Sequence, residues 1–359
     1  MKILAFLTKR FFYYAVALIS FTLIFGCVDP FMVEVDEGLQ LLTVEGMITN
    51  GPGPHKIKLT RSDTYGSVFE SLTRPVAGAT VIIRDQNGAV TFLEEDTEKR
   101  GEYLTDDDFR AKIGNVYSLQ IQLSNGDVYT SFPEKVNPSV EITGVSYESE
   151  VIPVEGEMGV DSGVAVYVDL QDPLEENNFY FWRNDPFTYE LNTRPDLFVN
   201  RETMMPEPKE CCFTCYLEEE VGNTSIFIAS DDSFNGLATR LKVAFIPDDG
   251  LRFITFSRLD INQLIVTAEA YRFLRLVKQQ TEISGSVFDP PPATIRGNII
   301  SLDNPDEMVL GYFIVASESN SRVYIDGTKL DFRQPRGLIT DDCRVVDDAV
   351  TTPPIDWNP

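Results

Sequence analysis

Segments in which apolar and polar residues alternate dominate the chain between residues 40 and 135. Residues 117–124 read Tyr-Ser-Leu-Gln-Ile-Gln-Leu-Ser, so every second side chain is apolar. A period of two predicts a strand with one buried face. Asn125 and Gly126 follow, a pair that favours a tight hairpin turn into the next strand. The same pattern predicts seven strands in this region: Leu41–Thr49, His55–Arg61, Ala79–Asp85, Ala89–Glu94, Gly101–Leu104, Val116–Ser124 and Asp127–Phe132.

Seven short strands in residues 40–135 predict a small β-sandwich of immunoglobulin or transthyretin type. The apolar positions of these strands define its expected core: Val44, Ile57, Leu59, Val81, Ile83, Phe92, Tyr103, Leu119 and Ile121. We expect residues 133–138, which begin and end with proline, to form a linker. The fold class is therefore mainly β.

Residues 140–330 predict a second, larger β-rich domain. Residues 184–224 are rich in proline, glutamate and cysteine, which indicates a long loop held by disulfides. Residues 331–359 predict a polar tail whose only evident attachment is Cys343. The expected strands are Val140–Ser146, Gly163–Leu170, Phe179–Trp182, Ile226–Ala229, Arg240–Pro247, Leu251–Ser257, Asp260–Val266, Thr294–Ser301, Val309–Ser317 and Arg322–Ile325.

One amphipathic helix is expected within the second domain, over residues 267–284. Thr267 is a suitable N-cap, and Glu269 falls in the first turn, where the helix dipole favours an acidic side chain. Ala270, Leu274, Val277 and Thr281 form one stripe. We expect this stripe to pack on a sheet, and a partner-binding helix is the alternative.

The first 26 residues have the pattern of a secretory signal. Lys2, Lys9 and Arg10 precede an apolar run of residues 11–25, which is short for a membrane span. Residues 23–27 resemble a bacterial lipobox, which implies that Cys27 is diacylated and becomes the first mature residue. Residues 27–39 then form an acidic tether. An ordinary signal peptide or a single membrane helix is the alternative.

Charge narrows the range of functions. The 359 residues include 56 acidic and 30 basic ones, for a formal net charge of −26. This excess argues against nucleic-acid binding and against electrostatic docking on an anionic bilayer, so covalent lipid would have to supply the attachment. The single histidine, His55, excludes multi-histidine metal sites.

The four remaining cysteines are Cys211, Cys212, Cys215 and Cys343. In an oxidising compartment an even set predicts disulfides, and four cysteines allow three pairings. A bond between adjacent cysteines strains the intervening peptide, so we expect Cys211 or Cys212 to reach Cys343 and the other to close a small loop with Cys215. A zinc site is the alternative, because Cys212 and Cys215 have a spacing that suits zinc.

No catalytic motif emerges from the sequence. There is no nucleophile elbow around a serine, no phosphate-binding glycine loop and no EF-hand. Acidic clusters at residues 106–108, 231–232, 248–249 and 341–342 are read as solvated turns, with calcium binding as the alternative. We therefore expect no catalytic residue, no resident metal and no cofactor.

Several short motifs follow one another along the chain: Val44–Thr49, Ile57–Arg61, Val76–Val81, Gly101–Tyr103, Ile113–Leu119, the Cys-Cys-x-x-Cys element at Cys211–Cys215, Ala268–Phe273, Gly285–Pro291, Gly297–Ile299 and Val309–Phe313. In this order they resemble a known family, the Bacteroidota outer-membrane lipoproteins of domain-of-unknown-function family 4249. The resemblance implies a surface accessory to a TonB-dependent receptor, because the genes of such lipoproteins often lie beside one. Acidic residues after the lipidated cysteine resemble a signal for export to the cell surface.

These observations favour a non-enzymatic binding protein, held on the extracellular face of the outer membrane by lipid at Cys27, with the periplasmic face as the alternative. The expected partner is a TonB-dependent receptor or another outer-membrane β-barrel protein. A structural or adhesive surface protein is the alternative, and a glycosidase-type hydrolase is the least favoured hypothesis.

Overall fold

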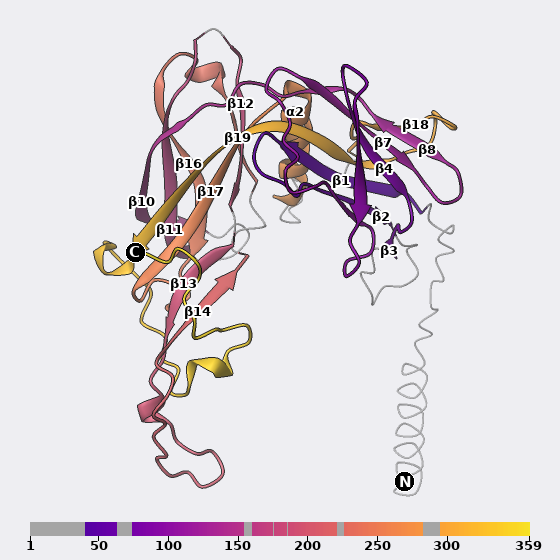
Figure 1. Cartoon of the computed structure of the whole chain (residues 1–359). Helices are drawn as coiled ribbons and strands as arrows, with labels where there is room; N and C mark the ends of the chain where they lie inside the picture. Colours follow the sequence, from indigo (N-terminus) through magenta and orange to yellow (C-terminus); the bar gives the residue numbers. More distant parts are fainter. Residues whose placement is uncertain are drawn as a thin grey trace, which may run out of the picture. The chain divides into compact units, whose positions relative to one another are not determined.

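The computed structural model describes residues 40–62, 74–153, 160–174, 176–184, 186–220, 226–282 and 295–359 (Figure 1). The expected signal segment, Cys27 and the acidic tether lie outside these residues. So do positions 283 and 284 of the expected helix. Within the described ranges the protein is mainly β, as the sequence pattern predicts.

All seven strands expected in residues 40–135 are present, and two strands of two residues each join them. The predicted linker at residues 133–138 is partly strand, because Glu134 and Lys135 pair with the strand that starts at Val116. The strands are β1 (Leu42–Thr49), β2 (Lys56–Arg61), β3 (Arg74–Pro75), β4 (Thr80–Asp85), β5 (Val90–Glu95), β6 (Glu102–Leu104), β7 (Val116–Gln122), β8 (Val128–Ser131) and β9 (Glu134–Lys135).

The hairpin between β7 and β8 forms where the sequence predicts it. Gly126 adopts a φ of 101°, a conformation that glycine tolerates and other residues rarely adopt. Its N–H donates to the carbonyl of Leu123 at 2.9 Å, and the N–H of Leu123 donates to the carbonyl of Asp127 at 2.9 Å. The turn therefore sets the register in which Ile121 faces Tyr129 in the core.

The expected core of this sandwich is buried at every position except one. Phe92 is 66% exposed, whereas its neighbour Leu93 is 8% exposed. Leu93 lies opposite Val81 in the β4–β5 pair, and Phe92 lies opposite Ile82. Because successive side chains of a strand point to opposite faces, Leu93 shares the core face with Val81, and Phe92 points outward. The prediction for Phe92 was wrong by one position.

Two further sheets pack around a second core. Strands β10 (Ile142–Pro153), β11 (Val160–Gln171) and β16 (Ala238–Pro247) form a three-stranded antiparallel sheet. The other sheet contains β12 (Phe179–Asn184), β13 (Phe187–Asn192), β14 (Thr214–Glu219), β15 (Phe227–Ser230) and β17 (Phe256–Val266). Their shared core includes Val164, Val166 and Val168 from β11 with Tyr180, Trp182, Phe187 and Tyr189 from the facing sheet.

One strand continues from the first sandwich into the second. β19 (Leu310–Asp326) pairs in parallel with β1 through Ala316, and then pairs antiparallel with β17 from Ser317 onward. At roughly 3.3 Å per residue its 17 residues extend about 55 Å. The two predicted strands at residues 309–317 and 322–325 are thus one strand, and those at 251–257 and 260–266 merge into β17, which begins at Phe256.

Part of the expected second domain belongs to the first sandwich. β18 (Ile299–Ser301) pairs with β8, and Ile299, Val309, Phe313 and Val315 are buried in the first core. The structure therefore assigns residues 299–316 to the sandwich formed by residues 40–135. A contiguous domain over residues 140–330 does not describe this arrangement.

The single described α-helix, α2 (Ala268–Thr281), packs on the sheet as expected. The Thr267 hydroxyl caps it by accepting from the Ala270 N–H at 3.2 Å. Ala270 and Leu274 are buried against a third cluster that includes Leu264 and Ile314. The helix packs on side chains of β12, β15, β17 and β19, and β19 is the strand that continues between the two sandwiches.

The buried carboxylate of Glu134 connects the N-cap of α2 to β19 and to Asn298, which precedes β18. Glu134 of β9 accepts hydrogen bonds from the hydroxyls of Thr267 and Tyr312, and from the Asn298 side-chain amide at 3.5 Å. Only 4% of Glu134 is exposed, and its desolvation raises the pKa of the carboxyl group above the usual value. The hydroxyl donors provide the partners that a buried carboxylate needs.

Candidate functional site: a disulfide-braced loop

The strands β13 and β14 carry a long loop, residues 193–213, which we call the braced loop. The two strands pair from Phe187 opposite Glu219 to Asn192 opposite Thr214, and the loop begins after that last pair. In Figure 1 the loop projects from the lower ends of β13 and β14, and the yellow C-terminal segment runs beside its base. The predicted loop over residues 184–224 was too long, because it included both strands.

The first brace is a disulfide between Cys215 of β14 and Cys343 of the C-terminal segment. Their sequence separation is 128 residues, and neither cysteine is exposed to solvent. Cys215 and Leu217 are both buried on β14, so the sulfur lies on the core side of the strand. The bond therefore fixes the C-terminal segment to the strand from which the braced loop emerges.

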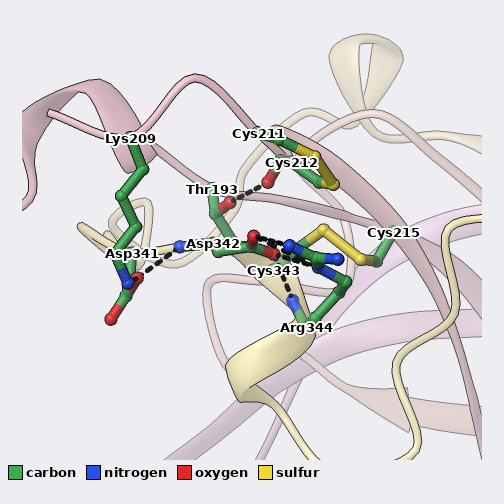
Figure 2. Close-up of polar contacts among 9 residues, drawn as sticks. All are labelled: Thr193, Lys209, Cys211, Cys212, Cys215, Asp341, Asp342, Cys343 and Arg344. Carbon is green, nitrogen blue, oxygen red and sulfur yellow. Dashed lines mark hydrogen bonds and ion pairs between the residues drawn. A yellow bond between two sulfur atoms is a disulfide. The ribbon is translucent and has the colours of Figure 1, made fainter.

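The second brace is a disulfide between the adjacent residues Cys211 and Cys212 (Figure 2). The expected pairing of either cysteine with Cys343 was wrong. Cys215 points into the core beside Cys343, whereas Cys211 is exposed at the end of the loop, so the adjacent pair is left to bond to itself. The peptide between Cys211 and Cys212 is cis.

The zinc alternative does not fit this arrangement. Among the described residues, Cys211, Cys212 and Asp342 form the only group of three potential metal ligands whose ligand atoms lie within 4.8 Å of one another. The two sulfur atoms are bonded to each other, and zinc requires thiolate ligands. The Asp342 carboxylate also forms an ion pair with the Arg344 guanidinium.

Hydrogen bonds join the loop end to the C-terminal segment. The carbonyl of Cys212 accepts from the Thr193 hydroxyl and from the Cys343 N–H, each at 3.1 Å. The Asp342 carboxylate accepts from the Arg344 backbone N–H at 2.9 Å and from its guanidinium at 2.6 Å. These interactions lower the pKa of Asp342 to about 2, mainly through the Arg344 side chain.

The polar contacts continue along the loop. Lys209 forms an ion pair with Asp341, and its ammonium group lies 3.9 Å from the centre of the Phe198 ring (Figure 2 shows the ion pair). The Arg194 N–H donates to the carbonyl of Ile339 at 2.8 Å. Both sides of the loop base are therefore tied to residues 339–341.

The tail has more attachments than the single cysteine that its sequence suggests. Val350 and Tyr216 exchange two backbone hydrogen bonds, of 2.7 and 3.0 Å, at the outer edge of β14. The Trp357 ring makes edge contacts with Tyr216 and Tyr324, with ring centres 5.3 and 5.5 Å apart. The tail thus covers an edge strand that would otherwise offer unpaired backbone groups.

Large apolar side chains are exposed on the braced loop. Met204 is 75% exposed and Met205 is 66% exposed at its tip, and Leu197, Val199 and Phe213 are each more than 40% exposed. Met204 has a φ of +57°, which is uncommon for a residue other than glycine. These positions were not among the predicted site residues, although two methionines followed by proline in a polar segment were an available signal.

The acidic pairs that were read as turns serve as turn residues where the structure describes their contacts. Asp248 accepts from the Gly250 N–H at 2.8 Å, and Asp249 accepts from the Leu251 N–H at 2.9 Å. Asp248 and Asp249 thus satisfy the backbone of their own turn. Asp231 is instead buried and accepts from the N–H of Asn178, 53 positions away, at 2.7 Å, so the prediction of a solvated turn was wrong for Asp231.

Comparison with known families decides the membership of this chain. Residues 28–322 match the model of a domain of unknown function, DUF4249. The chain belongs to the DUF4249 family. The matched range includes the first sandwich, most of the second, the braced loop and Cys211–Cys215, and it ends within β19, before Cys343. No curated protein matches the sequence. In the part of the chain that the structure describes, no helix has the length and apolar character needed to cross a bilayer.

Proposed function

We propose that this DUF4249 protein is a lipid-anchored outer-membrane protein that binds a partner protein through its braced loop. The proposed anchor is diacylated Cys27, on the extracellular face. The proposed partner is a TonB-dependent receptor or another outer-membrane β-barrel protein. The observation that carries the proposal is the exposure of Met204 and Met205 at the tip of a loop held by two disulfides.

Exposed apolar side chains on a fixed support favour binding for two reasons. Burying a methionine side chain contributes about 1.5–3 kcal/mol, so two of them can dominate a small interface. A loop that is already ordered loses less conformational freedom when it binds. The disulfides and the ion pair between Lys209 and Asp341 supply that order. Methionine also adapts its shape to varied apolar surfaces.

Recovery of the partner in a mild detergent tests the proposal. The full-length protein should co-purify with an outer-membrane β-barrel protein identified by mass spectrometry. Met204→Glu/Met205→Glu should reduce that recovery at least tenfold, because both side chains would carry charge into an apolar contact. Phe92→Glu is the matched control, since Phe92 is equally exposed but lies on the first sandwich. Equal recovery with the loop variant and with wild type contradicts the proposal.

The anchor has a separate test. Metabolic labelling with a radioactive or alkyne-bearing fatty acid should label the wild-type protein, and the signal should disappear in Cys27→Ala or after inhibition of lipoprotein signal peptidase. Labelling that survives the substitution would show that Cys27 is not the lipidated residue.

A further inference from the structure

A cleft distinct from the braced loop opens beside α2. It has a volume of about 780 Å³. Residues of β1, β2, β12, β17 and β19 line it, together with Phe273 and Leu274 from the second turn of α2. A volume of this size suits a small ligand rather than a protein surface. Its lining strands bury the first core (β1 and β2) or the second core (β12 and β17) with their other faces.

One side of the cleft is apolar. Met47 of β1 and Ile314 of β19 line it from the sheet, Phe181 lines it from β12, and Phe273 and Leu274 line it from α2. Aromatic and aliphatic side chains of this kind accept apolar groups of a ligand. A fully charged or sugar-like ligand would leave this wall in contact with poorly matched polar groups.

Charged groups of both signs line the same cleft. Lys56 is neutralised by Glu102 at 3.3 Å, and the Glu318 carboxylate accepts from the Thr49 hydroxyl at 2.6 Å. The charged lining residues that remain, Glu45, Lys58 and Arg183, make no ion pair with any described residue. A ligand with charge of only one sign would be opposed by one of these groups.

Strand register places these free charges in two rows. Glu45 lies between Lys58 and Tyr312 across β2, β1 and β19. Arg183 lies opposite Asn262, which lies opposite Asn320, across β12, β17 and β19. Arg183 is the only cation in its row, so its guanidinium group is the one that would bind a ligand carboxylate.

The spacing of the rows limits the length of a ligand that reaches both. Tyr312 and Asn320 are eight positions apart on β19, which is at most roughly 26 Å along a strand. An extended peptide of six residues spans about 20 Å, and the Glu45 and Arg183 side chains can cover the remainder.

Two polar atoms on the cleft wall have no hydrogen-bond partner. The Asn262 side-chain oxygen and the His55 Nε2 atom are both buried and unpaired, and both residues line the cleft. Only 8% of His55 is exposed, and burial lowers the pKa of its imidazole group. Both atoms lie beneath the surface of the wall, so each lacks the partner that a buried polar atom usually has.

We propose that this cleft binds a short linear peptide of about six residues with apolar side chains and free termini. The apolar wall takes the side chains. Arg183 binds the terminal carboxylate, and Glu45 binds the terminal ammonium group. This inference does not depend on the proposed partner or on the braced loop.

Affinity selection with the full-length protein in detergent tests this site. The probe is a library of hexapeptides built from Ala, Val, Leu and Phe with free termini, followed by calorimetric titration of the enriched sequence. Met47→Trp should abolish binding by filling the cleft floor, with far-UV circular dichroism and the melting temperature confirming that the variant folds. Failure to enrich any hexapeptide, or unchanged binding by folded Met47→Trp, overturns the proposal.

Modified termini then test the two charged contacts separately. Amidating the peptide's C-terminus should weaken binding to wild type about tenfold, but it should have no further effect on Arg183→Gln. Acetylating the N-terminus should weaken binding to wild type similarly, but not to Glu45→Gln. Arg201→Gln, which removes an exposed cation of the braced loop, should behave as wild type. Equal losses in all variants would contradict the assignment of these residues.

Discussion

Removing the disulfide between Cys215 and Cys343 should destabilise the protein far more than removing the one between Cys211 and Cys212. The first bond closes a loop across a sequence separation of 128 residues. The chain-entropy relation for a loop of this length gives about 5 kcal/mol of stabilisation through the unfolded state. The second bond joins adjacent residues, so it removes little freedom from the unfolded chain.

The matched variants are Cys215→Ala/Cys343→Ala and Cys211→Ala/Cys212→Ala. Equilibrium unfolding in urea, followed by far-UV circular dichroism, should show a loss of about 3–5 kcal/mol for the first variant. For the second variant the loss should stay below about 1 kcal/mol. Limited proteolysis should also cleave residues 331–359 faster in the first variant. Equal losses in the two variants would refute the reasoning that loop length determines the stabilisation.

Further predictions concern other parts of the structure. The exposed disulfide Cys211–Cys212 should be reduced by a phosphine reductant in the folded protein while the buried disulfide persists, as alkylation and mass spectrometry would show; simultaneous loss of both bonds would contradict this order. Asp342 has a folded pKa of about 2 against 3.8 unfolded, so its stabilisation is present above pH 3.8 and is lost as the pH falls toward 2. Asp342→Asn should therefore reduce the dependence of the melting temperature on pH between pH 2 and 3.8. A pH dependence unchanged from that of wild type would contradict the contribution of Asp342. Leu93→Ala should cost about 2–4 kcal/mol, whereas Phe92→Ala should cost less than about 0.5 kcal/mol, and the opposite order in urea unfolding would show that the outward assignment is wrong.

The sequence pattern predicts the first sandwich well because its strands are short, alternating and separated by turn residues. Asn125 and Gly126 mark a turn that the structure confirms, and the strands on either side keep one apolar face. Phe92 shows that an alternating pattern alone does not always identify the buried face of a strand. Two adjacent apolar residues in β5 do not reveal which one faces inward, because that depends on the register with β4.

The second sandwich was harder to predict because its strands do not follow simple local signals. Residues 317–321 of β19 read Ser-Glu-Ser-Asn-Ser, which is typical of a turn, yet they pair with β17 throughout. Tertiary pairing overrides their weak strand propensity. β13 could have been predicted from its sequence, because Phe187, Tyr189 and Leu191 alternate with polar residues, and all three are buried.

The candidate site could be predicted only in outline. The sequence indicates a cysteine-rich loop, but the pairing depends on which face of β14 carries Cys215. The alternation of Cys215 with Leu217 on the buried face was the available signal. The cleft beside α2 had no sequence signal, because Glu45 and Arg183 meet it from strands that are far apart in the chain.

The most direct test of the central claim is site-specific photocrosslinking in living cells. A photoreactive amino acid replaces Met204 at the tip of the braced loop, and a matched cell line carries it at Phe92. The account predicts a crosslink from position 204 to an outer-membrane β-barrel protein, and none to that protein from position 92. No β-barrel adduct from position 204, or the same adduct from both positions, would contradict it.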